Sequence, residues 1–588
     1  MEDIDEKERL KGDKKMPTGE LLKRTLVYIK PQLPKFIISF ILIFSHVGMD
    51  ILLPFITSRI TNSLTEVPIA VRTAIYLSVA YLAISIVDNF FYYIESMILQ
   101  KAGQDTVLTL REDVFKHIES MSQNQFTEMP VGSLVTRVTS YTQSLSDLFT
   151  NVLVSVVRNI VMVVGVYAVM YFIDVKLSLI MLIPVTVIFV SSLIFSKIVG
   201  KIFRSERKSI SELNAFMSEN LSGMKITQIF NREEKKLAEF DEKNENLRHS
   251  RFHVVLAFGV YRPLVTFINI ASIALVFLFG VKAGLDAAAI VAFYLYVGRF
   301  FSPIQQLADQ LNNIQKALTA SERLFNLMDV APEVRDKPDA IAVDKFEGRI
   351  EFRNVWFAYN AEDWILKDVS FVIEPRQTCA FVGATGAGKT TILSLIVRNY
   401  EIQKGQILID GIDIANIQIK SLRRAIGQML QDVFLFSGTV KSNISLHDDT
   451  IPDEEIKEAC RYIGADTFIE KMPKQYDEEI IERGENFSQG QRQLLSFART
   501  VLHKPQMLIL DEATANIDTE TEVLIQQSLE KMRNIGTMLV VAHRLSTIQH
   551  ADQIIVLQNG EIIERGNHQE LLAQHGYYWK LYRLQFEQ

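Results

Sequence analysis

Long apolar runs dominate the first half of the chain, whereas apolar and polar residues are mixed in the second half. A helix needs about 20 predominantly apolar residues to cross the hydrocarbon core of a bilayer. Six segments in the first half meet this requirement, so the pattern predicts a membrane domain of six helical spans. The predicted spans are Phe36–Ile60, Ala74–Leu99, Val154–Ile173, Leu177–Phe195, Val254–Gly280 and Leu285–Phe301.

The connections between the predicted spans differ sharply in length. Only Asp174–Lys176 joins the third span to the fourth, and only Val281–Gly284 joins the fifth to the sixth. The connections Lys101–Thr150 and Lys197–Arg251 are long and polar, and their pattern predicts mostly helix. We therefore expect tight hairpins on one side of the membrane and long helical extensions on the other.

Basic residues place the long connections in the cytoplasm. They gather before the first span and after the fourth, where the positive-inside rule expects the cytoplasmic face. Six spans then return the chain to the cytoplasm, so both termini are predicted to be cytoplasmic in a multi-pass protein of the cytoplasmic membrane. The basic residues concerned are Lys23, Arg24, Lys30, Lys35, Lys197, Lys201, Arg204, Arg207 and Lys208.

Shifts in composition predict the domain boundaries. Residues 1–17 are expected to form a charged cytosolic tail, and residues 18–330 a membrane domain that begins with an amphipathic helix over Thr18–Ile29. Residues 331–347 contain two prolines and many charges, which indicates a linker. Residues 348–588 are expected to form a soluble domain. The net charge of −7 gives no indication of a nucleic-acid partner.

A glycine-rich segment at the start of the soluble domain matches the P-loop pattern. It follows a strand-like run and opens a helical run, so backbone N–H groups and a helix N-terminus would face a bound phosphate. Lys389 supplies a positive charge to the β- and γ-phosphates, and Thr390 offers a hydroxyl to magnesium. The predicted cofactors are therefore ATP and Mg²⁺, and residues 348–588 form the predicted nucleotide-binding domain. The residues assigned to nucleotide here are Gly383, Ala384, Thr385, Gly386, Ala387, Gly388, Lys389, Thr390 and Thr391.

Two carboxylates follow a second apolar strand. The run Met507–Leu510 predicts a buried parallel strand that ends at Asp511 and Glu512. Asp511 is positioned to reach magnesium, and Glu512 to polarise the attacking water. Downstream of a P-loop, this pair indicates hydrolysis of ATP.

The P-loop, Gln431, Ser488–Gln493, Asp511–Glu512 and His543 occur in the order and spacing of an ABC ATPase. Together with the six spans, they make the chain from Thr18 onward resemble an exporter-type half-transporter of the ABC superfamily. The resemblance implies six transmembrane helices with long cytoplasmic extensions. It also implies an α/β P-loop cassette with an antiparallel β subdomain and an α-helical subdomain.

The resemblance assigns further roles within the cassette. Tyr359 would stack on adenine, Gln431 would sense magnesium and contact the membrane domain, and His543 would contact the γ-phosphate. The catalytic residues are then Glu512, His543 and Gln431, and the magnesium ligands are Thr390, Gln431 and Asp511. Asp518 resembles the residue that crosses to a partner cassette, and Glu482–Glu485 resembles a loop that couples the two domains.

The family's signature motif is altered in this chain. The usual pattern is Leu-Ser-Gly-Gly-Gln, whereas Phe487-Ser-Gln-Gly-Gln stands here. Ser488, Gly490 and Gln491 keep the phosphate-binding groups, but Gln489 adds bulk where the backbone approaches ATP.

Family members work as head-to-tail dimers in which each signature serves the partner's ATP. The combination resembles the hydrolytically competent half of heterodimeric bacterial multidrug exporters. We favour a heterodimer, with a homodimer as the alternative.

The membrane half contains ionisable residues within its predicted spans. Asp50, Asp88, Arg158 and Arg262 either line a substrate cavity, or form a pair such as Asp88 with Arg158, or lie near a membrane surface, or serve structural hydrogen bonds. Two cytoplasmic stretches resemble the coupling regions of the family. They are Gln125–Arg137 and Met217–Glu233.

The predicted function is export of amphipathic small molecules, with multidrug export as the leading form, driven by ATP hydrolysis through alternating access. A lipid or lipopeptide exporter or flippase shares every motif and stays open. An ATP-gated regulator or channel is an alternative of another class, against which the intact Glu512 and His543 count. The predicted partners are a second half-transporter, an amphipathic substrate and membrane lipid.

Overall fold

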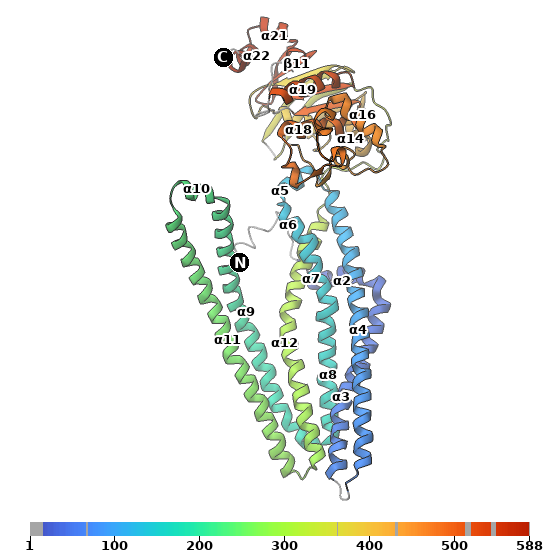
Figure 1. Cartoon of the computed structure of the whole chain (residues 1–588), viewed down its shortest axis with the longest axis vertical. Helices are drawn as coiled ribbons and strands as arrows, with labels where there is room; N and C mark the ends of the chain where they lie inside the picture. The colour runs from blue at the N-terminus through green and yellow to red at the C-terminus, as the bar shows by residue number, and fades with distance from the viewer. Residues whose placement is uncertain are drawn as a thin grey trace. The chain divides into compact units, whose positions relative to one another are not determined.

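The computed structural model describes residues 16–65, 69–360, 363–429, 433–511, 519–541 and 548–586. They form two compact units (Figure 1). The first unit consists of Met129–Ala331 together with the described residues before Met121. The second consists of Met121–Glu128 together with the described residues from Pro332 onward.

Long helices carry all six predicted spans, which confirms the membrane domain. The predicted amphipathic helix is also confirmed, as α2 (Thr18–Ile29). A 3₁₀ turn, η1 (Lys30–Gln32), separates it from the first span helix. The span helices are α3 (Leu33–Thr65), α4 (Val71–Glu119), α8 (Leu153–Ile173), α9 (Val175–Ser222), α11 (Glu233–Lys282) and α12 (Ala287–Asp329).

Two aspartates determine where span helices begin. Asp174 Oδ1 accepts a hydrogen bond from the backbone N–H of Leu177 at 2.7 Å, at the start of α9. Asp286 Oδ1 accepts one from the N–H of Ala289 at 2.8 Å, at the start of α12. Such N-caps satisfy N–H groups that lack a partner within the helix. Helix α12 therefore begins at Ala287, two residues after the predicted start of the sixth span.

The core of the first unit centres on α12. Only 11–33% of the most apolar stretch of each of the first five spans is buried, compared with 56% in the sixth. Phe293 and Tyr296 of α12 are fully buried and pack with Ile43 and Val276. Helix α12 lies between the α9–α11 pair and the group of α3, α4 and α8 (Figure 1). The outer faces of the other spans remain available to lipid or to a partner.

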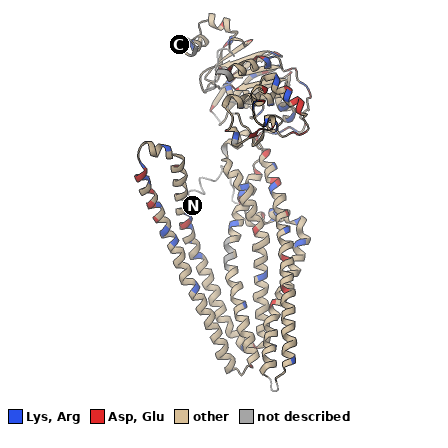
Figure 2. Ribbon diagram, viewed as in Figure 1, with Lys and Arg blue, Asp and Glu red and all other residues tan. Residues whose placement is uncertain are grey.

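Charged residues within the spans are isolated positions among uncharged ones (Figure 2). Several of them contact a residue of another span helix. The predicted pair of Asp88 with Arg158 is wrong. Asp88 Oδ1 instead contacts His46 Nδ1 at 2.7 Å, and Arg158 Nη2 donates to Glu95 Oε1 at 2.5 Å. Glu95 lies seven residues after Asp88 on the same face of α4, so it reaches the guanidinium first.

The other two ionisable residues singled out from the sequence, Asp50 and Arg262, have different partners. Asp50 of α3 forms an ion pair with Arg299 of α12. The Arg262 guanidinium lies over the ring of Phe258, 5.6 Å from its centroid. The contact between His46 and Asp88 therefore links α3 to α4, and the two ion pairs link α4 to α8 and α3 to α12.

The extensions beyond the spans contain short helices, as expected for the two predicted coupling regions. Helix α10 (Met224–Ile229) lies within the predicted stretch Met217–Glu233, at the tip of the α9–α11 hairpin (Figure 1). The other stretch contains α5 (Gln123–Glu128) and α6 (Val131–Thr136). The extension continues through the π-helical turn η2 (Arg137–Tyr141), α7 (Thr142–Asp147) and the π-helical turn η3 (Leu148–Val152).

Helix α5 is held to the second unit by a carboxylate. Glu333 Oε2 accepts hydrogen bonds from Ser122 Oγ and Asn124 Nδ2, each at 3.2 Å. Ser122 and Gln125 are nearly fully buried. Although α5 is a short segment between parts of the first unit in sequence, it therefore belongs to the second unit in structure.

The second unit contains the sheets that the resemblance implies. A six-stranded sheet has the order β12-β11-β3-β10-β9-β6 and is parallel except for β12. A four-stranded antiparallel sheet has the order β2-β1-β4-β5, and β7 pairs with β8. The strands are β1 (Ile350–Ala358), β2 (Trp364–Ile373), β3 (Thr378–Val382), β4 (Lys404–Ile409), β5 (Ile412–Asp413), β6 (Ile426–Met429), β7 (Gly438–Thr439), β8 (Glu479–Ile480), β9 (Met507–Asp511), β10 (Thr537–Val541), β11 (Gln553–Gln558) and β12 (Glu561–Gly566).

Helices cover the parallel sheet and build a separate helical part. The α-helices are α13 (Lys389–Ile396), α14 (Ile419–Ala425), α15 (Val440–Ile444), α16 (Asp453–Ile463), α17 (Asp466–Ile469), α18 (Gln489–Leu502), α19 (Thr519–Met532), α21 (His568–Ala573) and α22 (Tyr577–Phe586). The 3₁₀ turns are η4 (Ile414–Asn416), η5 (Gln475–Asp477) and η6 (Glu482–Gly484).

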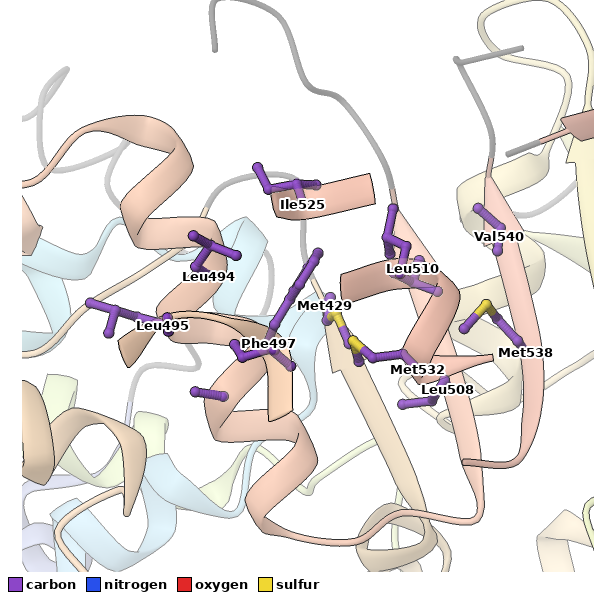
Figure 3. Close-up of a cluster of buried hydrophobic side chains, with 14 of the residues drawn as sticks. Met429, Leu494, Leu495, Phe497, Leu508, Leu510, Ile525, Met532, Met538 and Val540 are labelled. Atoms are coloured by element: carbon purple, nitrogen blue, oxygen red, sulfur yellow. The ribbon is translucent and has the colours of Figure 1, made fainter. Parts of the chain in front are cut away.

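A hydrophobic cluster fixes α18 and α19 to the parallel sheet (Figure 3). Phe497 of α18 is almost fully buried and packs with Leu508 and Leu510 of β9. Ile525 and Met532 of α19 belong to the same cluster. Strand β9 is therefore covered by apolar side chains up to its last residue, Asp511, which suits a buried parallel strand.

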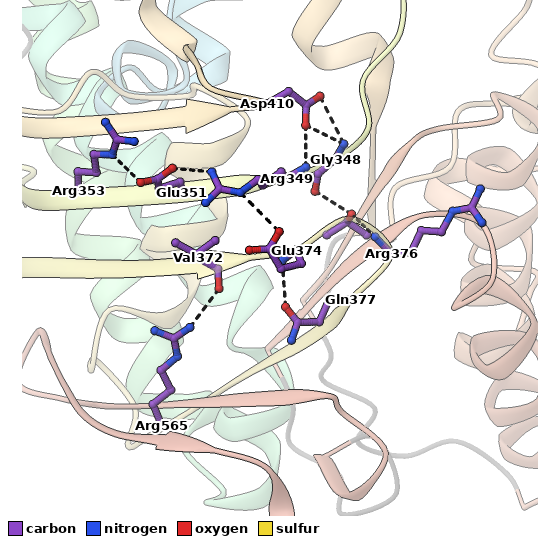
Figure 4. A network of polar contacts seen from close by, with 11 residues as sticks. Gly348, Arg349, Glu351, Arg353, Val372, Glu374, Arg376, Gln377, Asp410 and Arg565 are labelled. Atoms are coloured by element: carbon purple, nitrogen blue, oxygen red, sulfur yellow. Dashed lines mark hydrogen bonds and ion pairs between the residues drawn. The ribbon is translucent and has the colours of Figure 1, made fainter.

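A polar network joins the start of β1 to the neighbouring strands (Figure 4). Asp410 accepts hydrogen bonds from the backbone N–H groups of Gly348 and Arg349. The carboxylate of Glu351 accepts one hydrogen bond from Arg353 and one from Arg349, each at 2.5 Å. These two guanidinium groups lower the pKa of Glu351 to about 2.

Candidate nucleotide-binding site

Strand register brings the P-loop and the second acidic motif to one edge of the sheet. Val541 of β10 lies opposite Phe381 of β3 on one side and opposite Asp511 of β9 on the other. The P-loop follows β3, and Asp511 ends β9. Because all three strands are parallel, these segments emerge level with one another at the carboxyl edge, where α/β sheets bind ligands.

Glycines allow the P-loop to turn. Gly386 and Gly388 have φ angles of 82° and 99°, in the left-handed region that side chains disfavour. A Cβ on Gly388 would also lie 2.6 Å from Leu366 Cδ2. Ala384 and Thr385 are exposed, whereas Ala387 is buried. The loop thus presents its backbone to solvent and packs its base against β2.

Lys389 is held inside the loop. Its Nζ donates to the carbonyl oxygens of Gly383 at 2.7 Å and Ala384 at 3.0 Å, and the side chain is only 7% exposed. Burial lowers the pKa of Lys389, and the negative charge of Asp511 opposes that shift. A buried ammonium bonded only to neutral carbonyls favours an anionic ligand such as a phosphate.

The residues at the edge of the sheet fit a magnesium triphosphate. Thr390 is exposed in the first turn of α13, and Asp511 is close enough to Lys389 to influence its charge. A hydroxyl and a carboxylate are oxygen ligands of the kind that Mg²⁺ prefers. Bound there, the ion would neutralise charge on the phosphates.

Tyr359 lies beside the helix that the P-loop opens. Its hydroxyl contacts Thr391 Oγ1 at 3.1 Å, and the side chain is 43% exposed. Tyr400 packs against its ring, with centroids 5.1 Å apart. Sequence reasoning missed Tyr400, because an aromatic residue after a helix carries no distinguishing pattern. Only the packing reveals it.

The altered signature begins α18 with a capping box. Ser488 Oγ accepts a hydrogen bond from the N–H of Gln491 at 3.2 Å, and Gln491 Oε1 accepts one from the N–H of Ser488 at 2.9 Å. Gly490 is buried, whereas Gln489 is half-buried. Among the hydrogen bonds of the described residues, none joins Ser488, Gly490 or Gln491 to the P-loop.

Four of the predicted site residues lie outside the described residues. They are Gln431, Glu512, Asp518 and His543. The described residues of the predicted site include Tyr359, the P-loop with Lys389, Thr391, and Asp511 at the end of β9.

A P-loop site on a parallel sheet, in one chain with six helices long enough to cross a membrane, defines a membrane-spanning nucleotide-binding protein. Residues 36–304 match the family described as ABC transporter transmembrane region, and residues 366–515 match the family described as ABC transporter. The chain belongs to the ABC transporter family. It is homologous to exporter half-transporters and is an ATPase coupled to transport.

Relatives of this chain are named for different cargoes. A probable multidrug resistance ABC transporter ATP-binding/permease protein, YheH of Bacillus subtilis, is 39% identical over 88% of this chain and 77% of its own length. A fatty acid ABC transporter ATP-binding/permease protein of Mycobacterium bovis is 35% identical over 88% of this chain and 81% of its own. An ATP-dependent lipid A-core flippase of Syntrophus aciditrophicus is 31% identical over 99% of this chain and 96% of its own length.

Proposed function

We propose that this chain is one half of an exporter that moves amphipathic small molecules across the cytoplasmic membrane. The observation that carries the proposal is the union, in one chain, of six spans with a P-loop site. The relatives support this cargo class, because one is named for multidrug resistance and others for fatty acid and lipid A. Both termini and the ATPase domain are cytoplasmic in this proposal, which the basic residues beside the spans support.

Each part of the nucleotide site has a proposed role. Tyr359 stacks on adenine, the P-loop backbone and Lys389 hold the phosphates, and Thr390, Asp511 and Gln431 hold magnesium. Glu512 polarises the attacking water, and His543 contacts the γ-phosphate. Glu512 and His543 follow the ends of β9 and β10 by one and two residues, which supports these roles because both strands end at the P-loop edge.

The signature helix is proposed to serve the ATP of a partner half. In the capping box, Ser488 Oγ accepts from Gln491 N–H, so its own proton is free to donate to a phosphate oxygen. Gln489 follows Ser488 and is half-buried. Its side chain leaves less room for the backbone of the signature to approach the partner's ATP. We infer a heterodimer in which this signature serves the weaker of two ATP sites; a homodimer is the alternative. Copurification from native membranes with a second half-transporter would support the heterodimer, and recovery of an active ATPase made of this chain alone would refute it.

The export proposal is tested by uptake into inverted membrane vesicles. Vesicles containing the full chain and its copurifying partner are given the amphipathic fluorescent dye Hoechst 33342 with ATP or with ADP. The dye should be depleted from the outer solution only with ATP, because the cassettes face outward in inverted vesicles. A dye movement that ADP supports equally well would contradict ATP-driven export.

A lipid flippase is a second candidate, favoured by the exposure of apolar residues along the spans. Ile86, Phe90 and Tyr93 of α4 are 58–70% exposed, and such a face would contact lipid. The same vesicles distinguish the two functions when they contain a lipid with a fluorescent headgroup, because a flippase alone changes the fraction of lipid that a membrane-impermeant quencher reaches.

A further inference from the structure

Three aromatic rings from two segments meet beside the P-loop helix. The rings of Phe357 and Tyr359 lie 4.9 Å apart with an interplanar angle of 86°. Tyr400 lies 5.1 Å from Tyr359 at 81° and 5.6 Å from Phe357 at 58°. Edge-to-face packing at these distances is the favoured geometry for aromatic pairs. The plane of the Tyr359 ring is therefore set by its contacts with two other rings and by its hydroxyl contact with Thr391.

Tyr400 is the better anchored of the two tyrosines. Tyr359 follows the last residue of β1 and is 43% exposed, so its ring orientation depends on what it touches. Tyr400 is half-buried and follows Arg398 by two residues. Arg398 is 1% exposed and donates to the carbonyl oxygens of Ile414 and Ile417 at 3.3 and 3.1 Å. The segment that carries Tyr400 is thus fixed to the interior of the domain.

The chemistry of Tyr400 suits packing rather than charge. Burial raises the pKa of its phenol, with smaller contributions in the same direction from Tyr359 and Glu333. The ring consequently stays neutral across the working pH range, and its face and edge remain available to other aromatic groups.

We propose that Tyr400 is a positioning residue for the nucleotide base: it holds the Tyr359 ring in the plane on which adenine stacks. The proposal rests on the proposed role of Tyr359 and extends it to a residue that makes no predicted contact with ATP. The affinity of the site for the adenine base then depends on Tyr400. Phosphate binding through Lys389 and the chemical step do not depend on it.

The test separates base binding from phosphate binding in the full-length transporter, reconstituted in nanodiscs with any copurifying partner. Steady-state ATPase gives KM for ATP and kcat, and inorganic tripolyphosphate, which has no base, serves as a competitive inhibitor. Tyr400→Leu should raise the KM for ATP about two- to tenfold, the range that one aromatic pair contributes. Its kcat and the inhibition constant of tripolyphosphate should stay at parental values. Tyr400→Phe keeps the ring and should behave as the parent.

Two further variants make the test specific. Tyr462→Leu makes the same change in another half-exposed tyrosine of the cassette, whose hydroxyl donates to the Lys531 carbonyl oxygen, and should leave KM unchanged. In a Tyr359→Leu background, Tyr400→Leu should add no further loss, because its effect passes through the Tyr359 ring.

Several results would overturn the proposal. A parental KM in Tyr400→Leu would show that Tyr359 needs no support, and an equal loss of ATP and tripolyphosphate binding would indicate general damage to the domain. Additive losses in the double variant would show that Tyr400 acts independently. A parent without ATPase activity would instead contradict the proposed transport function, so the two failures are distinguishable.

Discussion

At the scale of single residues, Lys389 shows how burial prepares a site for an anion. Its ammonium is 7% exposed and is bonded to two carbonyl oxygens that carry no net charge. A desolvated cation whose hydrogen-bond partners are neutral is incompletely stabilised, even with the carboxylate of Asp511 nearby. Phosphate oxygens would complete its environment, so the residue contributes more to the bound state than to the empty one.

Replacing Lys389 by alanine should therefore weaken nucleotide binding without unfolding the domain. We expect the affinity for a fluorescent ATP analogue to fall about 10- to 100-fold, the range for a lost hydrogen bond to a charged group. Equilibrium titration of the purified full-length variant measures this change. The control is Lys404→Ala, which removes an exposed lysine from the other sheet, where it lies over Trp356 and Trp364. Equal affinities in the two variants would contradict the P-loop assignment.

At the scale of elements, the ion pairs of β1 predict a dependence of cassette stability on pH. Arg353 and Arg349 lower the folded-state pKa of Glu351 to about 2, below the ordinary glutamate value of about 4.3. A lowered carboxyl pKa contributes stability above the unfolded-state value, and that stability is lost as the pH falls toward the folded-state value.

The parent should consequently lose part of its cassette stability between about pH 4.3 and pH 2. Glu351→Gln should flatten that dependence and lower stability at neutral pH. All three tryptophans, Trp356, Trp364 and Trp579, lie in the cassette, so tryptophan fluorescence during denaturant unfolding reports on this domain alone. Parallel pH profiles for parent and variant would contradict the contribution of Glu351.

Helix α5 is the element whose placement sequence reasoning anticipated least. Its position between two parts of the membrane domain in sequence gives no indication that Glu333, more than 200 residues later, holds it to the second unit. If α5 transmits movement of the cassette, the bonds from Ser122 and Asn124 to Glu333 carry part of that coupling.

Glu333→Ala should then reduce the cargo-stimulated part of ATPase activity by about twofold or more, since single positions modulate coupling by roughly 0.5–2 kcal/mol. Basal activity should remain near that of the parent. Glu347→Ala changes an exposed glutamate near the start of the cassette and is the matched control. Stimulation that is the same in both variants would show that the anchoring of α5 does not contribute to coupling.

At the scale of the whole molecule, periodicity and motif spacing predicted what depends on local sequence. Apolar length fixes the six spans, and the run Thr378–Val382 before a glycine loop fixes strand β3 and helix α13. Which side chains pair depends on how the helices are rotated about their axes, and the sequence does not show that rotation. Arg158 therefore pairs with Glu95 rather than with Asp88, and Tyr400 joins Tyr359 only through the folded packing.

In the proposed mechanism, hydrolysis of ATP, rather than its binding alone, drives export. Glu512 directly follows Asp511, the last residue of β9, and is the proposed base for the attacking water. Glu512→Gln should therefore remove hydrolysis while keeping the shape of the side chain. The most direct measurement is ATP-dependent dye uptake into inverted vesicles containing this variant, with ATP binding measured in the same preparation. We expect parental ATP binding and a loss of uptake of about 100-fold or more, the contribution of a general base. Uptake at the parental rate in a variant that binds ATP without hydrolysing it would contradict hydrolysis-driven export and identify an ATP-gated pathway instead.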